Sequence, residues 1–170
     1  MAFVLVNIGS NLGDRRLNLS RAMLAVGREF GDFEMSHVVE SAPWGFDSTH
    51  SFLNLGMAFN TDLPPEEVLA RLQAIEKKLS PEAHRTPDGG YADRVIDIDI
   101  MAIDREVVDS PILKVPHPHL PKRRFFLEPL AELAPGWTHP ETGLTASEML
   151  ALLPVETAAA PTSKKKPCED

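Results

Sequence analysis

The sequence has almost no cysteine, and its first residues lack the features of an export signal. Cys168 is the single cysteine among 170 residues, so no disulfide can form within the chain, and this favours a reducing compartment. Residues 1–14 contain no basic segment ahead of their apolar run, and that run is far too short to span a bilayer. We therefore expect a soluble cytoplasmic protein with no membrane partner.

Basic residues are also scarce. The chain has 17 Lys and Arg against 25 Asp and Glu, a net charge of −8. This excess of acid argues against nucleic acid as a partner held by overall charge, and it leaves only a local basic site. Because 43% of the residues are apolar and the length fits one domain, we expect one folded domain over residues 1–153. Residues 154–170 lose all periodicity and predict a disordered tail.

Apolar periodicity predicts four strands and two long helices in the order βαββαβ. The expected elements are strands at 2–8, 33–41, 52–63 and 94–103, and helices at 14–30 and 64–79. The second helix opens on two prolines, with Thr61 or Asp62 as its expected cap. Short helices are expected after Arg124 and near the end of the domain. This order predicts an α+β, ferredoxin-like sandwich, in which helices pack on an antiparallel sheet, with C-terminal additions.

Two acids interrupt an isoleucine-rich strand. Asp97 and Asp99 are two residues apart, so they project from one face, and Ile96, Ile98 and Ile100 project from the other. Two carboxylates about 7 Å apart by strand geometry repel each other unless a cation lies between them. Oxygen ligands of this kind suit Mg²⁺, and their spacing suits a two-metal site. The alternative is an exposed strand whose polar face lies in water.

A basic stretch follows in this acidic protein. Residues 115–130 contain His117, His119, Lys122, Arg123 and Arg124 on a backbone held extended by prolines. Arginine and imidazole groups are standard partners of phosphate. A solvated run of charge is the alternative. Zinc is disfavoured because no third histidine or cysteine lies at ligand spacing.

A loop rich in aromatic residues precedes the third strand. Residues 41–51 carry a tryptophan and a phenylalanine, and Phe52 and Asn54 follow. Aromatic walls with one amide suit a flat heterocycle that has hydrogen-bonding edges. The alternative is that these aromatic side chains belong to the core. Residues 9–14, GSNLGD, lack the full phosphate-loop pattern and predict a turn.

These segments in this order resemble the 6-hydroxymethyl-7,8-dihydropterin pyrophosphokinase family of folate biosynthesis. The matching text is IGSNLGD, APWGF followed by FLN, Glu76, DRVIDIDIM and VPHPHLPKRRFFLEPLAELAP. The resemblance covers residues 3 to about 152, and the last two blocks are specific to that family. It implies an enzyme that moves the β,γ-pyrophosphoryl group of ATP to the hydroxymethyl group of a reduced pterin and releases AMP. It also implies small-molecule substrates and is consistent with a monomer.

The resemblance implies roles for individual residues. Asp97 and Asp99 would bind two Mg²⁺ ions that bridge the phosphates, and Asp97 is also a candidate acceptor of the hydroxyl proton. Arg94 and Arg85 would act on the phosphates. The nucleotide would be held by Leu69, Gln73, Glu76, Tyr91, Ile100, Lys114, His117 and Arg123. The pterin would be held by Ala42, Pro43, Gly45, Phe52, Asn54 and Phe125.

The sequence departs from the family pattern beside the second helix. Many members have a Gly-Arg pair soon after the helix glutamate, and this chain has Ser80-Pro81 there. Arg85 is the candidate replacement. Pro118 also stands where some members carry an aromatic residue. We expect residues 80–93, a polar loop with glycine and proline, to close over ATP as a lid.

Two other functions fit parts of the pattern. A ferredoxin-like binding module would bind RNA or protein through its sheet, but RNA-binding sheets present aromatic residues where this strand presents aspartates. A metal-dependent phosphohydrolase would use the same acids and release inorganic phosphate without an acceptor. The products formed from ATP distinguish these two functions from the pyrophosphokinase.

Overall fold

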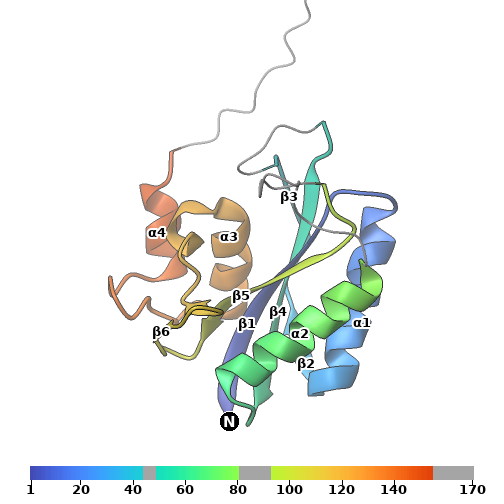
Figure 1. Cartoon of the computed structure of the whole chain (residues 1–170). Helices are drawn as coiled ribbons and strands as arrows, with labels where there is room; N and C mark the ends of the chain where they lie inside the picture. The colour runs from blue at the N-terminus through green and yellow to red at the C-terminus, as the bar shows by residue number, and fades with distance from the viewer. Residues whose placement is uncertain (44–48, 81–92, 155–170) are drawn as a thin grey trace, which may run out of the picture.

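A computed structural model describes residues 1–43, 49–80 and 93–154 of the chain. Among these residues, no helix has the length and apolar content that crossing a membrane requires. Figure 1 shows a sheet with helices on both sides. The strands and helices, in chain order, are β1 (Ala2–Ser10), α1 (Arg15–Phe30), β2 (Phe33–Met35), β3 (Val39–Ser41), β4 (Phe52–Thr61), α2 (Pro65–Leu79), β5 (Asp97–Ile103), β6 (Val108–Asp109), β7 (Lys114–Val115), α3 (Arg124–Leu133) and α4 (Ala146–Leu152).

The main sheet is antiparallel, and its strand order confirms the predicted fold. The order is β2–β4–β1–β5, and β3 also pairs with β4. Residues 33–41, expected as one strand, form two short ones. The break comes at Ser36, whose hydroxyl accepts the N–H of Gly56 at 2.9 Å. In a regular ladder a backbone carbonyl would accept this N–H, so the pairing of the strand is interrupted at Ser36.

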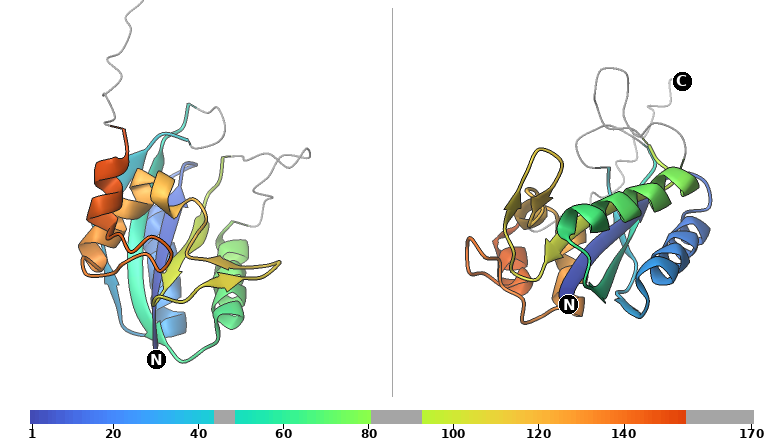
Figure 2. Two further views of the ribbon diagram at one scale, coloured as in Figure 1. Left: turned by 90° about the vertical axis from the view of Figure 1, so that its left-hand side faces the viewer. Right: turned by 60° about the horizontal axis from the view of Figure 1, so that its bottom comes forward.

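Each face of the sheet has its own hydrophobic core. On one face Val6 and Ile8 of β1 pack with Val26 of α1 and Leu72 of α2. On the other face Leu5 of β1 packs with side chains of α3 and α4. Figure 2 shows α1 and α2 lying together on one side of the sheet. The C-terminal helices therefore cover part of the face that carries the aspartates, which the sequence predicted to be an outward-looking polar face.

The expected cap of α2 is wrong. Its N-cap is Pro64, which makes no capping hydrogen bond through a side chain. Thr61 instead accepts the N–H of Leu63 at 3.2 Å, and Asp62 lies 3.2 Å from the amino group of Met1. The proline at the first helical position needs no donor partner, and two glutamates in the first turn favour the positive end of the helix dipole. By contrast, Asp14 caps α1 with a bond from the N–H of Leu17 at 3.1 Å.

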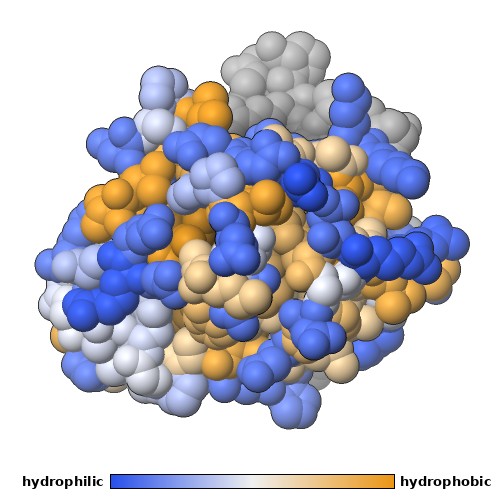
Figure 3. Space-filling model, turned by 90° about the horizontal axis from the view of Figure 1, so that it is seen from below, coloured by the Kyte–Doolittle hydropathy of each residue, from blue (hydrophilic) through white to orange (hydrophobic). Residues whose placement is uncertain are grey.

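Large exposed apolar side chains are spread over several elements. Leu24 of α1, Met35 of β2, Ile112 after β6 and Leu152 of α4 are all more than half exposed. Figure 3 shows apolar and hydrophilic residues interspersed over the face seen from below. Isolated exposed apolar residues of this kind are normal on protein surfaces.

Candidate active site

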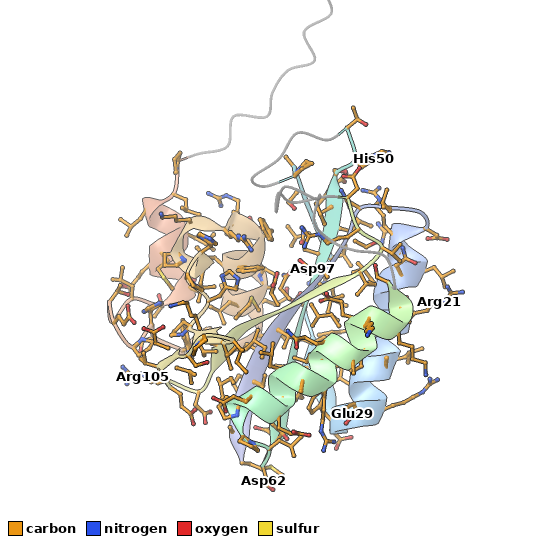
Figure 4. All side chains as sticks on the ribbon, viewed as in Figure 1. Arg21, Glu29, His50, Asp62, Asp97 and Arg105 are labelled. Atoms are coloured by element: carbon orange, nitrogen blue, oxygen red, sulfur yellow. The ribbon has the colours of Figure 1, made fainter. Side chains whose placement is uncertain are left out.

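A pocket of about 850 Å³ opens beside β5, between α2 and the start of α3. The segment between β6 and β7 forms another of its walls. Figure 4 shows Asp97 on β5, with α2 to one side and α3 to the other. The predicted site residues that line this pocket are Ala42, Phe52, Asn54, Leu69, Gln73, Glu76, Arg94, Asp97, Asp99, Ile100, Lys114, His117, Arg123 and Phe125. Residues far apart in the sequence are thus brought to one cavity.

Four predicted residues are not placed in this pocket. Pro43 is partly buried next to Ala42 but does not line it. Gly45, Arg85 and Tyr91 lie outside the described residues, as does most of the segment expected to act as a lid. Their roles, like those of the lining residues, stay predictions.

The aspartate pair lies on the sheet face that α3 approaches. Asp97 is opposite Gly9 of β1, and Asp99 is opposite Asn7. Burial raises the pKa of Asp99 well above its usual value, and the charge and side-chain hydrogen bond of Asp97 raise it further, while the Arg123 guanidinium opposes both effects. Two carboxylates this close and this buried resist being ionised together unless positive charge lies beside them.

Arg94 reaches the pair from just before β5. The strand was expected to begin at residue 94 and begins instead at Asp97. Because Arg94 precedes the regular strand, strand parity does not fix its direction, and its Nη1 lies 2.9 Å from Oδ2 of Asp97. The Arg94 side chain is only 9% exposed, so this ion pair is little screened by solvent.

The two carboxylates fit a magnesium ion bound together with a phosphate substrate. Both offer oxygen ligands on one face, which is the ligand type that Mg²⁺ prefers. Within the described residues no group of three or more His, Cys, Asp or Glu side chains is arranged to hold a metal. The protein therefore offers two carboxylates rather than a complete cage, and Mg²⁺ is commonly bound by one or two carboxylates plus phosphates and water.

Glu76 joins α2 to the edge of the sheet. Its Oε2 accepts the N–H of Ile98 at 2.9 Å. Burial, followed by the charge of Asp97, raises the pKa of Glu76 to about 7. The glutamate thus fixes the distance between α2, which carries Leu69 and Gln73, and the strand that carries the aspartates.

His117 is held neutral with a defined tautomer. Burial, followed by the charges of Arg123 and His119, lowers its pKa to about 3. The backbone N–H of His119 donates to Nδ1 of His117 at 3.1 Å, so the proton of the neutral ring is on Nε2. The ring meets Phe126 edge-on, with centroids 5.1 Å apart. A neutral N–H donor is therefore available on a ring that lines the pocket.

The rest of the basic stretch divides between the pocket and the surface. Arg123 is 7% exposed, and its guanidinium carbon lies 4.9 Å from the centre of the Phe126 ring. Lys114 lines the pocket and also pairs with Asp109 at 2.6 Å across β6 and β7. Lys122 and Arg124 are not pocket residues, and Lys122 is exposed. The phosphate-binding interpretation therefore fits Arg123 and His117, and the solvated-charge alternative fits Lys122.

The predicted pterin side of the pocket is built on β4 and its neighbours. Asn54 is 2% exposed, and its Nδ2 donates to Oγ of Ser41 at 2.7 Å and to the carbonyl of Val39 at 3.2 Å. A Cβ on Gly9 would lie 3.3 Å from Oδ1 of Asn54 and 3.4 Å from the ring of Phe52. Gly9 thus lets these two side chains lie close against β1 in the wall of the pocket.

Sequence reasoning missed two asparagines. Asn11, assigned only to a turn, is buried. Its backbone N–H donates to the carbonyl of Arg94 at 3.1 Å, and its Oδ1 accepts the backbone N–H of Arg94 at 2.7 Å. Its Nδ2 also donates to Asp93 at 2.7 Å and to the carbonyl of His50 at 3.2 Å. Asn7 lies in the middle of β1, lines the pocket and is 3% exposed. A polar residue inside the apolar run VLVNI was the available signal for Asn7.

Known proteins resemble this chain in sequence over most of its length. The family model of 7,8-dihydro-6-hydroxymethylpterin-pyrophosphokinase (HPPK) matches residues 5–135. A 2-amino-4-hydroxy-6-hydroxymethyldihydropteridine pyrophosphokinase of Porphyromonas gingivalis is 42% identical over 143 residues, which are 83% of this chain and 96% of the relative. Its counterpart in Aquifex aeolicus is 40% identical over 141 residues, 82% of this chain and 85% of the relative.

Solved structures share the fold at lower identity. A Plasmodium falciparum HPPK-DHPS structure matches with a TM-score of 0.68 and 13% identity, covering 88% of this chain and 45% of that one. A further HPPK-DHPS structure, in complex with substrates, matches with a TM-score of 0.66 and 11% identity, covering 88% of this chain and 43% of that one. This chain thus spans less than half the length of those proteins, and at such identity the likeness shows the fold alone.

Proposed function

Because the chain belongs to the 7,8-dihydro-6-hydroxymethylpterin-pyrophosphokinase family, we propose that its pocket transfers the β,γ-pyrophosphoryl group of ATP to 6-hydroxymethyl-7,8-dihydropterin. The products are AMP and the pterin diphosphate, an intermediate of folate biosynthesis. The observation that supports this most directly is that the acidic pair, the predicted nucleotide residues of α2 and the predicted pterin residues of β4 line one pocket.

The reaction needs a nucleophile, a leaving group and neutralised phosphates. The hydroxymethyl oxygen of the pterin attacks the β-phosphorus of ATP, the bond from the β-phosphorus to the α,β-bridging oxygen breaks, and the hydroxyl proton is lost. Mg²⁺ bound by Asp97 and Asp99 would supply charge neutralisation and alignment of the phosphates. The two carboxylates make this side of the pocket acidic, and Asp97 is the candidate acceptor of the hydroxyl proton.

Cationic and neutral donors surround the place where the phosphates would lie. Arg94 and Arg123 are both buried arginines that line the pocket, and buried guanidinium groups bind phosphate oxygens strongly. His117 presents a neutral N–H rather than a charge, because its pKa is lowered to about 3. These groups are preorganised, so they stabilise developing charge without rearrangement.

The substrates would enter from different elements. The adenine end of ATP fits the flank formed by Leu69 and Gln73 of α2 with Ile100 of β5. The pterin would lie between Phe52 and Phe125, with Asn54 at its edge, since all three residues line the pocket. Since the aspartates lie on β5 between these two regions, the pyrophosphoryl group would pass directly above them.

One assay separates the proposed function from its alternatives. The purified chain is incubated with ATP, Mg²⁺ and 6-hydroxymethyl-7,8-dihydropterin, and the nucleotides are resolved. We expect AMP in amounts equal to the pterin consumed, and no AMP when the pterin is left out. Inorganic phosphate released without pterin would indicate a phosphohydrolase, and no turnover at all would contradict both enzymatic functions.

A further inference from the structure

Helix α3 contains a proline that removes one of its own hydrogen bonds. Pro129 lies inside α3 and is buried. A proline has no backbone N–H, so the carbonyl four residues earlier loses its helical donor. That carbonyl belongs to Phe125, in the first turn of the helix and on the wall of the pocket.

The missing donor comes from the central strand of the sheet. Nδ2 of Asn7 donates to the carbonyl oxygen of Phe125 at 3.0 Å. Asn7 is 3% exposed, so this bond is shielded from water, and its loss would leave polar groups buried without this partner. A side chain of β1 therefore completes the hydrogen bonding of α3.

Backbone packing fixes the same junction. Asn7 is the Cα partner of Gly56 on β4. A Cβ built on Gly56 would lie 2.5 Å from Cβ of Pro129, which means that the proline sits directly on the glycine backbone. On its other side Asn7 is the Cα partner of Asp99. The amide thus lies next to the aspartate pair and beneath the start of α3.

We propose that Asn7 is a positioning residue of the active site: its amide replaces the donor that Pro129 removes and holds the first turn of α3, with Phe125, in place beside Asp99. The position of Phe125 sets one wall of the pterin space, and Arg123 precedes it with its guanidinium carbon 5.6 Å from the Phe125 ring centre. The identity of the ligand in this proposal rests on the proposed function. The hydrogen bond from Asn7 to Phe125 is independent of that function.

A double-mutant cycle tests this role. Asn7→Ala removes the donor, and Pro129→Ala restores a backbone N–H to α3 while keeping the Cβ that meets Gly56. We expect Asn7→Ala to raise the KM for the pterin alcohol about tenfold, the effect of losing one buried hydrogen bond. The KM for ATP should rise less than the KM for the pterin, because Leu69 and Gln73 of α2 are untouched and only Arg123, which precedes Phe125, moves with α3. The double variant should return the pterin KM to within about threefold of the wild-type value.

A control separates positioning from general stability. Thr61→Val removes a buried side-chain acceptor at the far end of β4, where Oγ1 of Thr61 accepts the N–H of Leu63 at 3.2 Å. We expect Thr61→Val to lower the melting temperature without changing either KM. A lowered melting temperature in Asn7→Ala with both KM values unchanged would show a bond that is only structural and would overturn the proposal. Lack of rescue by Pro129→Ala would overturn it as well.

The cycle remains decisive if Asn7→Ala does not fold. In that case Pro129→Ala is compared with the double variant, because Pro129→Ala supplies the backbone donor in both. We expect equal pterin KM values within about twofold, and a tenfold higher value in the double variant would overturn the proposal. If the wild-type chain makes no AMP, the proposed function fails, whereas rescue of the melting temperature of Asn7→Ala by Pro129→Ala still reports on the hydrogen bond.

Discussion

Asp99 is held where its surroundings resist ionisation. Its pKa is raised by burial and by the charge of Asp97, so ionisation of Asp99 in the folded protein costs free energy. A carboxyl whose pKa rises on folding stabilises the folded state at low pH, and that contribution is lost as the pH rises through the raised value. Ionisation of Asp99 at neutral pH therefore opposes folding of the protein.

Asp99→Asn should separate stability from activity. We expect the variant to have a higher free energy of unfolding than the wild type at pH 8 without divalent cations, because an amide carries no charge that burial and Asp97 oppose. The gain should shrink at pH 4, where wild-type Asp99 is protonated. Thermal unfolding at both pH values measures this, with the exposed Asp32→Asn as control. The variant should make no AMP, and near-wild-type turnover would remove Asp99 from the metal site.

His117 and His119 are neighbours with different expected importance. His117 lines the pocket, and its ring is held in one tautomer. His119 contributes the backbone N–H that holds it, and every residue except proline retains that N–H. We expect His117→Ala to lower kcat/KM for ATP about a hundredfold, as losing a preorganised donor does, and His119→Ala to stay within about threefold. Steady-state kinetics of both variants decide this, and equal losses would contradict it.

Helix α3 packs so closely on Gly56 of β4 that a side chain at position 56 would not fit. A Cβ on Gly56 would meet Cβ of Pro129 at 2.5 Å, Oγ of Ser36 at 3.1 Å and Cδ1 of Leu133 at 3.2 Å. Two of these neighbours belong to α3, and the first is rigid. The glycine is therefore required by close approach of the helix, and the position of α3 determines where Phe125 and Arg123 lie.

Gly56→Ala should push α3 away from the sheet. Overpacking of this kind costs about 1–3 kcal/mol, and we expect that loss in the free energy of unfolding together with a raised KM for the pterin. Gly136→Ala is the matched control, since a Cβ there meets nothing within 4 Å, and its effect should be below about 0.5 kcal/mol. Chemical denaturation of the two variants provides the comparison. Equal stabilities would show that α3 can shift without cost.

At the scale of the whole molecule, α4 is the last element of the described fold. Its residues Ala146 and Met149 are buried in the core beside α3, and Thr145 caps the helix with a bond from the N–H of Glu148 at 3.2 Å. Every described residue that lines the pocket precedes this helix. Among the described residues, α4 therefore contributes to the core beside α3 and not to the wall of the pocket.

Removal of residues 155–170 should leave the enzyme intact. We expect a chain ending at Pro154 to keep kcat, both KM values and a melting temperature within about 2 °C of the full chain, because none of the described core contacts would be lost. Ending the chain at Pro140 should instead cost stability, since it removes α4 and its contacts with α3. Kinetics and thermal unfolding of both truncations test this, and gel filtration of the full chain tests the expected monomer.

The sequence by itself determined the order of the main elements and the placement of two aspartates opposite the isoleucines of β5. Alternation places Asp97 and Asp99 on one face whatever the rest of the chain does, because period-two geometry is local. The blocks around these acids and around His117 carry the family resemblance, and the predicted residues of both blocks that lie in the described part of the chain line the pocket. Two local details were predicted wrongly. The break at Ser36 depends on a bond that its hydroxyl accepts, and the cap of α2 depends on a bond that Thr61 makes to Leu63 instead of to the helix.

Only the tertiary structure decided how the parts meet. The direction of Arg94 depends on a backbone turn held by Asn11 across 83 residues, and the pKa directions of Glu76, Asp99 and His117 depend on burial. The bond from Asn7 to Phe125 joins residues 118 apart in the chain, and its meaning depends on a third residue, Pro129. Local propensity cannot encode such contacts, because desolvation and hydrogen-bond partners arise only once separate segments pack together.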